Sequence, residues 1–404
     1  MRNKALAMWA VTLVLVTCAW AGSESVLYNF DSYSGDGYYG LSGLVADKSG
    51  NLYGMTYEGG AGYGAVYELV NSGGTWKESL IYSFTGGTSD GEYPQDASLV
   101  FDKSGNLYGV TYQGGAYGYG IVFKLSLSGG KWTETILHNF AGYPKDGSYP
   151  AAGLVFDAAG NMYGTTYEGG AHNYGSAYIM TLSKGKWTEK VIHSFAGGNG
   201  GDYPVGGLTV GKDGYFYGAT IYGGATYNEG TVYRLFEARG AWVEQSVYLF
   251  TGGTNGTYPY SGLTMDAAGN LYGTTYEGGA NNYGTVYKLK AGSNNKYTHS
   301  VLYAFKGGDT DGAYPYYAPV TLDSAGNIYG TTYEGGSQYD QGTVFELKLS
   351  AGKYKESVLH SFEDTSGNDG YDPRAGLLLL NGKLYGATYA GGTEGVGVVF
   401  EVKP

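Results

Sequence analysis

Glutamate and tyrosine recur at fixed positions of a repeated segment, and they are the residues here best suited to chemistry. Four copies place glutamate directly before a Gly-Gly pair: Glu58, Glu168, Glu277 and Glu334. Six copies place a tyrosine a few residues beyond the same pair: Tyr63, Tyr119, Tyr174, Tyr227, Tyr283 and Tyr339. A tyrosine ring offers a flat apolar face with a hydroxyl handle and loses little entropy on binding. Because sugars stack their C–H faces on such rings and donate hydroxyl hydrogens to carboxylates, we predict that these ten residues bind a carbohydrate.

The same residues have a structural alternative. A residue repeated in every copy usually performs one structural task several times, so the tyrosines would pack between copies or close turns. The glutamates would accept hydrogen bonds from turn N–H groups, and Tyr-Pro pairs such as Tyr93-Pro94 would mark the starts of strands. An asymmetric site is expected where the copies depart from the repeat, at Tyr222, Glu229, Tyr316-Tyr317, Asp340, Arg374 and Ala390.

The sequence shows no established catalytic or metal-binding pattern. Three of the five histidines share one repeat position, which other copies fill with tyrosine: His138, His193 and His360. They are expected on outer strands of different copies, too far apart to share a metal ion, and neither a zinc ligand set nor a Ser–His–Asp triad is visible. We therefore predict no catalytic residue, no metal site and no cofactor. The ring of carboxylates leaves a glycosidase or lyase as the alternative, because such enzymes use two carboxylates roughly 5–10 Å apart.

A repeated unit of about 55 residues must position these side chains. The Tyr-Gly that begins the segment Tyr163-Gly164-Thr165-Thr166-Tyr167-Glu168-Gly169-Gly170 occurs seven times, at Tyr53, Tyr108, Tyr163, Tyr217, Tyr272, Tyr329 and Tyr385. The intervals are 55, 55, 54, 55, 57 and 56 residues. Periods of this length are typical of propeller blades.

Each copy contains four strand-like runs bounded by turn residues. In the second copy they are residues 98–102, 106–112, 121–125 and 133–140, all rich in β-branched and aromatic residues. The first two runs are joined by Asp-x-x-Gly-Asn, whose Gly and Asn tolerate the positive φ of a tight hairpin. A glycine interrupts each second run, and we expect an aromatic side chain of the neighbouring blade to fill the space beside it. Tryptophans at the start of four fourth runs are expected to pack within their hairpins: Trp76, Trp132, Trp187 and Trp242.

Seven such sheets predict an all-β, seven-bladed propeller with four antiparallel strands per blade. The chain after residue 21 opens with Val26–Phe30, which matches the fourth run, and ends with Val398–Val402, which matches the third. The first strand should therefore complete the last blade and close the ring without an exposed sheet edge. The fourth-to-first and second-to-third connections should emerge on one face, which would concentrate Tyr, Asp and Glu around the axis.

The repeated Tyr-Gly-x-Thr-Tyr-x-Gly-Gly-Ala units, each followed by a Gly-x-Val-Tyr/Phe-x-Leu strand, resemble the GloVer (Gloeo/Verruco) tandem repeat of exported bacterial "choice-of-anchor" proteins. The resemblance covers all seven copies. It implies export and a repeat fold, and it supplies no catalytic residues.

Composition and the N-terminus fix the expected setting. Arg2 and Lys4, an apolar run and Ala19-Trp20-Ala21 predict a signal peptide over residues 1–21, leaving residues 22–404 as the propeller. Cys18, the only cysteine, lies within that segment, so the mature chain would form no disulfide; lipidation of Cys18 is the alternative. The net charge of −12 disfavours nucleic acid and anionic membranes as partners.

The favoured function is that of a secreted, cell-surface or periplasmic binding or scaffolding protein without catalytic activity. Its expected partner is an extracellular polysaccharide or a surface protein, and no membrane span is expected in the mature chain. A polysaccharide-active enzyme and a structural protein of the cell envelope remain the alternatives. The oligomeric state is not specified by the sequence.

Overall fold

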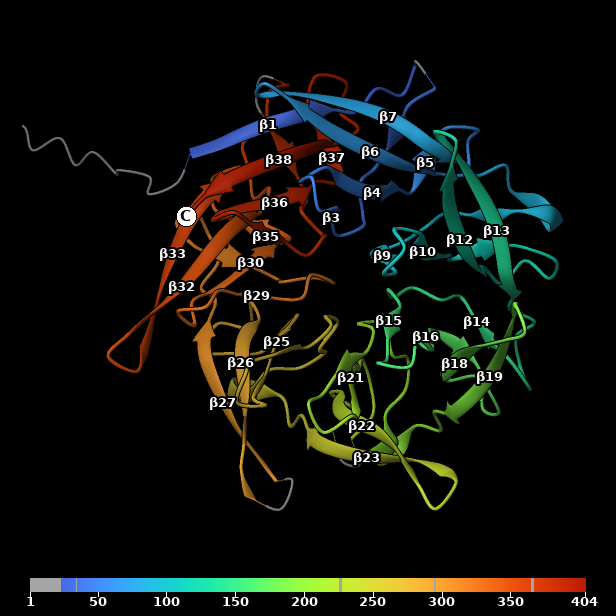
Figure 1. Ribbon diagram of the computed structural model, residues 1–404. Helices are drawn as coiled ribbons and strands as arrows, with labels where there is room; N and C mark the ends of the chain where they lie inside the picture. The colour runs from blue at the N-terminus through green and yellow to red at the C-terminus, as the bar shows by residue number, and fades with distance from the viewer. Residues whose placement is uncertain (1–22, 34, 225–226, 294–295, 365–366) are drawn as a thin grey trace, which may run out of the picture.

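A computed structural model describes residues 23–33, 35–224, 227–293, 296–364 and 367–404 as seven four-stranded antiparallel sheets arranged in a ring (Figure 1). The predicted signal peptide lies outside the described residues. The seven-bladed propeller is therefore confirmed, and in each blade the first strand lies nearest the axis and the fourth lies at the rim (Figure 1).

The strands occupy equivalent positions in every blade. The innermost strands are β3 (Val45–Ala46), β9 (Val100–Phe101), β15 (Val155–Phe156), β20 (Thr209–Val210), β24 (Thr264–Met265), β29 (Thr321–Leu322) and β35 (Leu378–Leu380). The second strands are β4 (Leu52–Thr56), β10 (Leu107–Thr111), β16 (Met162–Thr166), β21 (Phe216–Thr220), β25 (Leu271–Thr275), β30 (Ile328–Thr332) and β36 (Lys383–Ala387). The third strands are β6 (Ala65–Ser72), β12 (Ile121–Ser128), β18 (Ser176–Ser183), β22 (Thr231–Ala238), β26 (Thr285–Ala291), β32 (Thr343–Ser350) and β38 (Val398–Lys403). The outer strands are β7 (Thr75–Ser83), β13 (Lys131–Asn139), β19 (Lys186–Ser194), β23 (Ala241–Leu249), β27 (Tyr297–Ala304), β33 (Lys353–Ser361) and β1 (Ser23–Asn29).

The ring closes as the sequence predicts. Strand β1 pairs antiparallel with β38, so the first strand of the described chain completes the blade that the last strands begin (Figure 1). Phe30, which follows β1, is buried and meets Tyr67 of the next blade edge-on, with ring centroids 5.3 Å apart. Six further blade contacts repeat this arrangement, for example Phe84 against Phe123 at 5.2 Å. Buried aromatic contacts therefore join each blade to the next.

The hairpin between first and second strands forms as expected. In the second blade Asp102 accepts hydrogen bonds from the Ser104 and Asn106 N–H groups, the Asn106 side-chain amide and the Tyr108 hydroxyl. These bonds favour the charged form and lower the pKa of Asp102, although burial opposes the shift. The same turn lowers the pKa of Asp157, Asp266 and Asp323.

One packing expectation is wrong, and another is incomplete. The aromatic side chain beside each second-strand glycine comes from the third strand of the same blade, as Tyr67 does beside Gly54. The tryptophans face a residue of their own hairpin, as Trp132 faces Leu127, and also pack across the blade boundary, as Trp132 does against Tyr53 of the preceding blade with ring centroids 6.3 Å apart. Both contacts are set by the strand register and the ring order, which the local sequence does not reveal.

Candidate functional site

The two sets of connections that carry tyrosine and acid emerge on the same face, because they pair with each other. Five blades show this as short two-stranded sheets: β2 (Gly37–Tyr38) with β5 (Glu58–Gly59), β8 (Gly91–Glu92) with β11 (Gln113–Gly114), β14 (Gly147–Ser148) with β17 (Glu168–Gly169), β28 (Gly312–Ala313) with β31 (Glu334–Gly335), and β34 (Gly370–Tyr371) with β37 (Ala390–Gly391). Single bridges, Asp202 with Tyr222 and Thr257 with Glu277, replace them in the other two. Three of these connections also contain a 3₁₀ turn, η1 (Gly87–Ser89), η2 (Gly198–Gly200) and η3 (Gly253–Asn255).

The four predicted glutamates lie one per blade on this face, half-buried in those short strands and bridges. In three of these copies the N–H of the following glycine donates to another side chain: Gly169 to Asn173, Gly278 to Asn282 and Gly335 to Asp340. Each glutamate lies close enough to a tyrosine to raise the pKa of its phenol beyond the effect of burial, as Glu58 does for Tyr38 and Glu334 for Tyr314. The four carboxylates therefore lie beside aromatic rings.

The six predicted tyrosines form the outer part of the same face. Four of them rest edge-on or tilted against a tyrosine of the adjoining connection, such as Tyr63 on Tyr93 with ring centroids 5.9 Å apart and Tyr283 on Tyr314 at 5.4 Å. Tyr227 and Tyr339 are 58% and 48% exposed. These tyrosines support the rings nearer the axis and present only part of their surface to solvent.

A second set of tyrosines, which the sequence reasoning missed, lies closer to the axis. Each lies one or two residues beyond the end of a second strand and is half-buried: Tyr57, Tyr112, Tyr167, Tyr276, Tyr333 and Tyr389. All six lie face-to-face or tilted against a tyrosine of a connection, for example Tyr57 on Tyr93 and Tyr112 on Tyr149, each with centroids 5.0 Å apart. We call these six tyrosines and their partners the tyrosine basin. Their signal was the Tyr of the Thr-Tyr-x-Gly-Gly motif, which six of the seven copies carry and Ile221 replaces in the fourth.

The partner tyrosines have a strained backbone. Five of them, and Tyr258 at the same position of another copy, have positive φ values between 53° and 61°: Tyr39, Tyr93, Tyr149, Tyr203, Tyr258 and Tyr314. This region is sparsely populated by bulky side chains and costs on the order of 1 kcal/mol or more per residue. The conformation is held by hydrogen bonds on both sides, as when the Tyr93 N–H donates to the Tyr63 carbonyl at 2.8 Å and the Tyr112 N–H donates to the Tyr93 carbonyl at 3.1 Å.

The centre of the basin breaks the sevenfold symmetry. The residue two places after each of these tyrosines, or after Asp372 in the last copy, differs in kind between blades: Leu41, Gln95, Ala151, Val205, Tyr260, Tyr316 and Arg374. The segments from these positions to β9 and β29 are also one residue longer than the equivalent segments of the other five connections. In these longer segments Asp96 and Tyr317 have positive φ values of 47° and 56°. We call Asp96, Tyr260, Tyr316, Tyr317 and Arg374 the axial cluster.

The axial cluster is a continuous set of contacts. Tyr316 meets Tyr260 at 5.1 Å and Tyr317 at 4.2 Å between ring centroids. The Arg374 guanidinium lies over the rings of Tyr333 and Tyr389, at 5.0 and 4.5 Å from their centroids. Below it, a cavity of about 280 Å³ along the axis is lined by residues that include Asp96, Tyr317, Gly153 and Pro319.

Two polar atoms of the axial cluster are buried without a hydrogen-bond partner, Asp96 Oδ1 and Arg374 Nε. Within the described chain Arg374 makes no ion pair within 4.0 Å, although its charge influences Asp96 and Asp372. Burial raises the pKa of Asp96 to about 7, and the charge of Arg374 only partly opposes this shift. The axial cluster therefore contains one buried acceptor and one buried donor that have no hydrogen-bond partner.

The predicted departures from the repeat fall into two groups, one in or beside the axial cluster and one in the connections around it. Arg374 and the Tyr316-Tyr317 pair converge at the axis, and Tyr222 lies beside Tyr258 with ring centroids 5.5 Å apart. Glu229 accepts a short hydrogen bond from the Thr257 hydroxyl, and Asp340 caps the Gly335 N–H. Ala390 pairs with Tyr371 in a short sheet.

The opposite face carries a cavity of about 540 Å³ between the second and third blades. Its lining includes Tyr108, Phe156, Leu182 and Trp187. Tyr108 packs against Phe156 and Trp187 across this blade boundary, so the cavity follows from blade packing.

At the rim, a glutamate from each of six outer strands lies at the boundary with the preceding blade: Glu24, Glu78, Glu134, Glu189, Glu244 and Glu356. In every case Oε1 is buried without a hydrogen-bond partner. Burial raises the pKa of Glu78 to about 8 and of the other five to about 7. The three histidines at one repeat position also lie here, on separate outer strands as expected.

The sequence matches the Gloeobacter/Verrucomicrobia repeat family over residues 12–220, 96–336 and 269–404. The chain belongs to this family. No curated protein matches it. Among solved structures it is similar to a protein of unknown function from Dyadobacter fermentans, with 12% identity, coverage of 94% of this chain and 96% of the other, and a TM-score of 0.46.

It is also similar to PorZ of Porphyromonas gingivalis, an essential bacterial surface component of the type-IX secretion system. The identity is 15%, the TM-score is 0.51, and the match covers 90% of this chain. The chain spans about half of that protein, 46% of its length. At this identity the likeness concerns the propeller fold. No helix in the described part of the chain has the length and apolar character needed to cross a membrane.

Proposed function

We propose that this protein is an exported, non-catalytic propeller that binds a neutral carbohydrate chain, such as an extracellular polysaccharide, in the tyrosine basin. The observation that carries the proposal is the convergence of half-exposed tyrosine rings on an axial cluster whose Asp96 Oδ1 and Arg374 Nε lack partners. Sugar rings would stack on the tyrosines, and their hydroxyl groups would donate to Asp96 and accept from Arg374.

Charge favours a neutral saccharide over an acidic one. The chain carries a net charge of −12, and the same face carries Glu58, Glu168, Glu277 and Glu334. A polyanion would be repelled by this field, whereas a neutral sugar would use the carboxylates as hydrogen-bond acceptors. Arg374 is the only arginine or lysine in the axial cluster.

A glycan array followed by titration of tyrosine and tryptophan fluorescence tests the proposal. We expect a neutral oligosaccharide to bind, and Arg374→Ala and Tyr316→Ala to weaken binding at least tenfold. Arg239→Ala and Tyr117→Ala are the matched controls, because both residues are exposed and lie outside the axial cluster. Absence of saccharide binding at millimolar concentration would remove the proposal and favour a structural role in the envelope.

One observation favours a second candidate, a polysaccharide-active enzyme. A carboxyl group whose pKa is raised to about 7, as for Asp96, is suited to act as a general acid near neutral pH. Burial also raises the pKa of Asp372, the other carboxyl group near Arg374. Release of reducing sugar from a bound polysaccharide, lost in Asp96→Asn while binding persists, would support catalysis; its absence supports binding alone.

A further inference from the structure

The boundaries between outer strands repeat one arrangement around the rim, and two of them contain a set of metal ligands. In five blades the Tyr or His of an outer strand hydrogen-bonds to an aspartate eight or nine residues later: Tyr28 with Asp36, Tyr82 with Asp90, His138 with Asp146, Tyr303 with Asp311, and His360 with Asp369. The outer strand of the next blade adds a glutamate beside the pair. Where the ring is histidine, the three side chains supply one nitrogen and two carboxylates.

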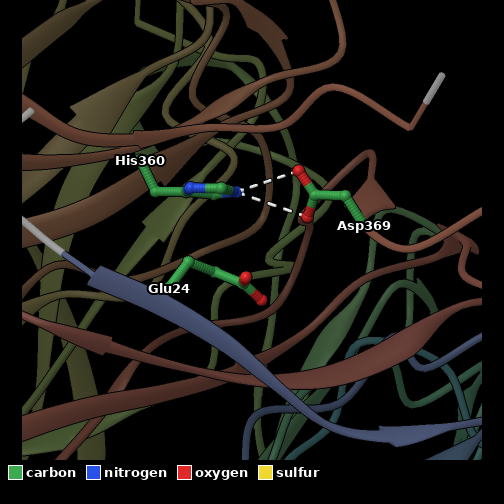
Figure 2. Close-up of side chains that lie close together, drawn as sticks. All are labelled: Glu24, His360 and Asp369. Carbon is green, nitrogen blue, oxygen red and sulfur yellow. Dashed lines mark hydrogen bonds and ion pairs between the residues drawn. The ribbon is translucent and has the colours of Figure 1, made fainter. Parts of the chain in front are cut away.

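Glu24, His360 and Asp369 form the first set (Figure 2). His360 Nε2 lies 3.1 Å from Asp369 Oδ2 and 3.3 Å from Oδ1, and the Glu24 carboxylate points toward the same space (Figure 2). One ligand atom from each side chain lies within 4.8 Å of the other two. Glu24 Oε1 is buried and has no hydrogen-bond partner. The set joins β1, β33 and the connection that follows β33.

His138, Asp146 and Glu189 form the second set, with the same 4.8 Å limit between ligand atoms. His138 Nε2 lies 3.0 Å from Asp146 Oδ2, and Glu189 Oε1 is again buried without a partner. The Asp146 carboxylate is fixed by the Ala141 and Gly147 N–H groups at 2.8 and 2.7 Å. Asp369 is held in the same way by Glu363 and Gly370. Such bonds to the backbone orient a carboxylate ligand without occupying all its lone pairs.

The other boundaries provide an internal comparison. Tyr28, Tyr82 and Tyr303 keep the aspartate and the glutamate but offer a phenol in place of the imidazole nitrogen. The boundary at His193 has the imidazole but lacks the aspartate, because Gly201 occupies the position of Asp146 in the second set. The aspartate and the glutamate therefore occur together at a boundary whether or not a histidine is present. The three ligands come together only where the outer strand carries histidine and the aspartate is kept.

We propose that each of these two boundaries binds one divalent first-row metal ion, with Zn²⁺ as the reference cation. Imidazole and carboxylates suit this class of ion, with bonds of about 2.0–2.2 Å and ligand atoms roughly 3.4 Å apart in tetrahedral geometry. The His Nε2–Asp distances of 3.0–3.3 Å are already near that separation, and the glutamate atom lies within 4.8 Å of both. The ion binds His Nε2 in the neutral tautomer whose proton lies on Nδ1, and water completes the coordination.

The ion at the first set would tie the closing strand β1 to the preceding blade. The side chains of His360 and Asp369 each retain 17% of their surface, and those of His138 and Asp146 retain 20% and 13%, so an ion can approach both sets from solvent. Metal binding should therefore stabilise the folded ring in proportion to the free ion concentration.

Equilibrium dialysis of the chelator-treated chain against micromolar Zn²⁺, with the metal measured by mass spectrometry, tests the proposal. We expect two ions per chain, one ion in His138→Tyr or His360→Tyr, and none in the double variant. Tyrosine is the residue that four other blades carry at this position, so the variants should fold, which circular dichroism checks. His193→Tyr is the matched control and should keep two ions.

Tyr82→His supplies the missing nitrogen beside Asp90 and Glu134 and is expected to raise the count to three. Fewer than one ion per chain in the unaltered protein would overturn the proposal, as would two ions retained by the double variant. A count that stays at two in a folded Tyr82→His chain would contradict the inference that histidine distinguishes the binding boundaries.

Discussion

Replacing Glu78 with glutamine should stabilise the propeller at alkaline pH and have little effect near pH 5. Burial, with a further contribution from Asp36, raises the pKa of Glu78 from 4.5 to about 8 in the folded chain. Between these values the folded state holds a proton that the unfolded state has lost, so stability falls as the pH rises. Glutamine, a neutral isostere of the protonated acid, removes this dependence.

The full shift in the pKa of Glu78 corresponds to roughly 5 kcal/mol at about 1.4 kcal/mol per pH unit. Because the side chain is only half-buried, solvent screening reduces the effect to about 1–2 kcal/mol. For a ring of this size the unfolding entropy converts that free energy into a rise in Tm of about 1–3 °C.

Differential scanning calorimetry of Glu78→Gln and the unaltered chain at pH 5 and pH 8.5 measures the difference. The exposed Glu237→Gln, on β22, is the control. We expect the variant to gain stability at pH 8.5 and to lose that advantage at pH 5. An equal change in Tm at both pH values, or destabilisation at pH 8.5, would refute the claim that Glu78 is protonated at this boundary in the folded chain.

Three further changes test the fold and its pH dependence. Gly54→Ala places a Cβ 2.6 Å from Cζ of the buried Tyr67 ring and should lower the free energy of unfolding by about 1–3 kcal/mol. Gly200→Ala is the control and should be almost neutral, because the nearest atom to its new Cβ is 3.4 Å away. Phe30→Ala removes a fully buried ring at the closing strand and should cost about 3–5 kcal/mol by thermal unfolding; an unchanged Tm would show that the closure does not support the ring. Asp102→Ala should destabilise the chain by roughly 1–3 kcal/mol at pH 7, and by less as the pH falls below 4, because the lowered pKa of Asp102 makes its contribution depend on the charged form.

The blade count, strand order and ring closure could all be predicted, because they depend on patterns within the sequence. The 55-residue period sets the number of blades, and the match of residues 26–30 to the fourth run predicts the pairing of β1 with β38. The partner of Gly54 could not be assigned in this way. It depends on the register that sets Gly54 opposite Tyr67, and a glycine in a strand does not indicate which neighbouring chain fills its space.

The site was predicted in part. The acid- and tyrosine-bearing connections share a face, as expected, but the repeated tyrosines at Tyr63 and its equivalents support the basin from outside. The centre is built by the position after each Tyr-Pro or Tyr-Gly pair, which is the Asp372-Pro373 pair in the last copy, and by the extra residue in two connections. A comparison of the copies at that position alone would have drawn attention to Gln95, Tyr260, Tyr316 and Arg374. That side chains from three different copies meet at the axis follows from the closure of the ring, which a comparison of the copies does not show.

Isothermal titration calorimetry with the oligosaccharide that binds best tests the axial site most directly. Because the axial cluster is unique in the ring whereas the outer tyrosines recur, a site at the axis predicts one saccharide per chain and loss of the binding heat in Arg374→Ala. Several equivalent sites per chain, or full binding by Arg374→Ala, would place saccharide recognition on the recurring outer tyrosines and contradict an axial site.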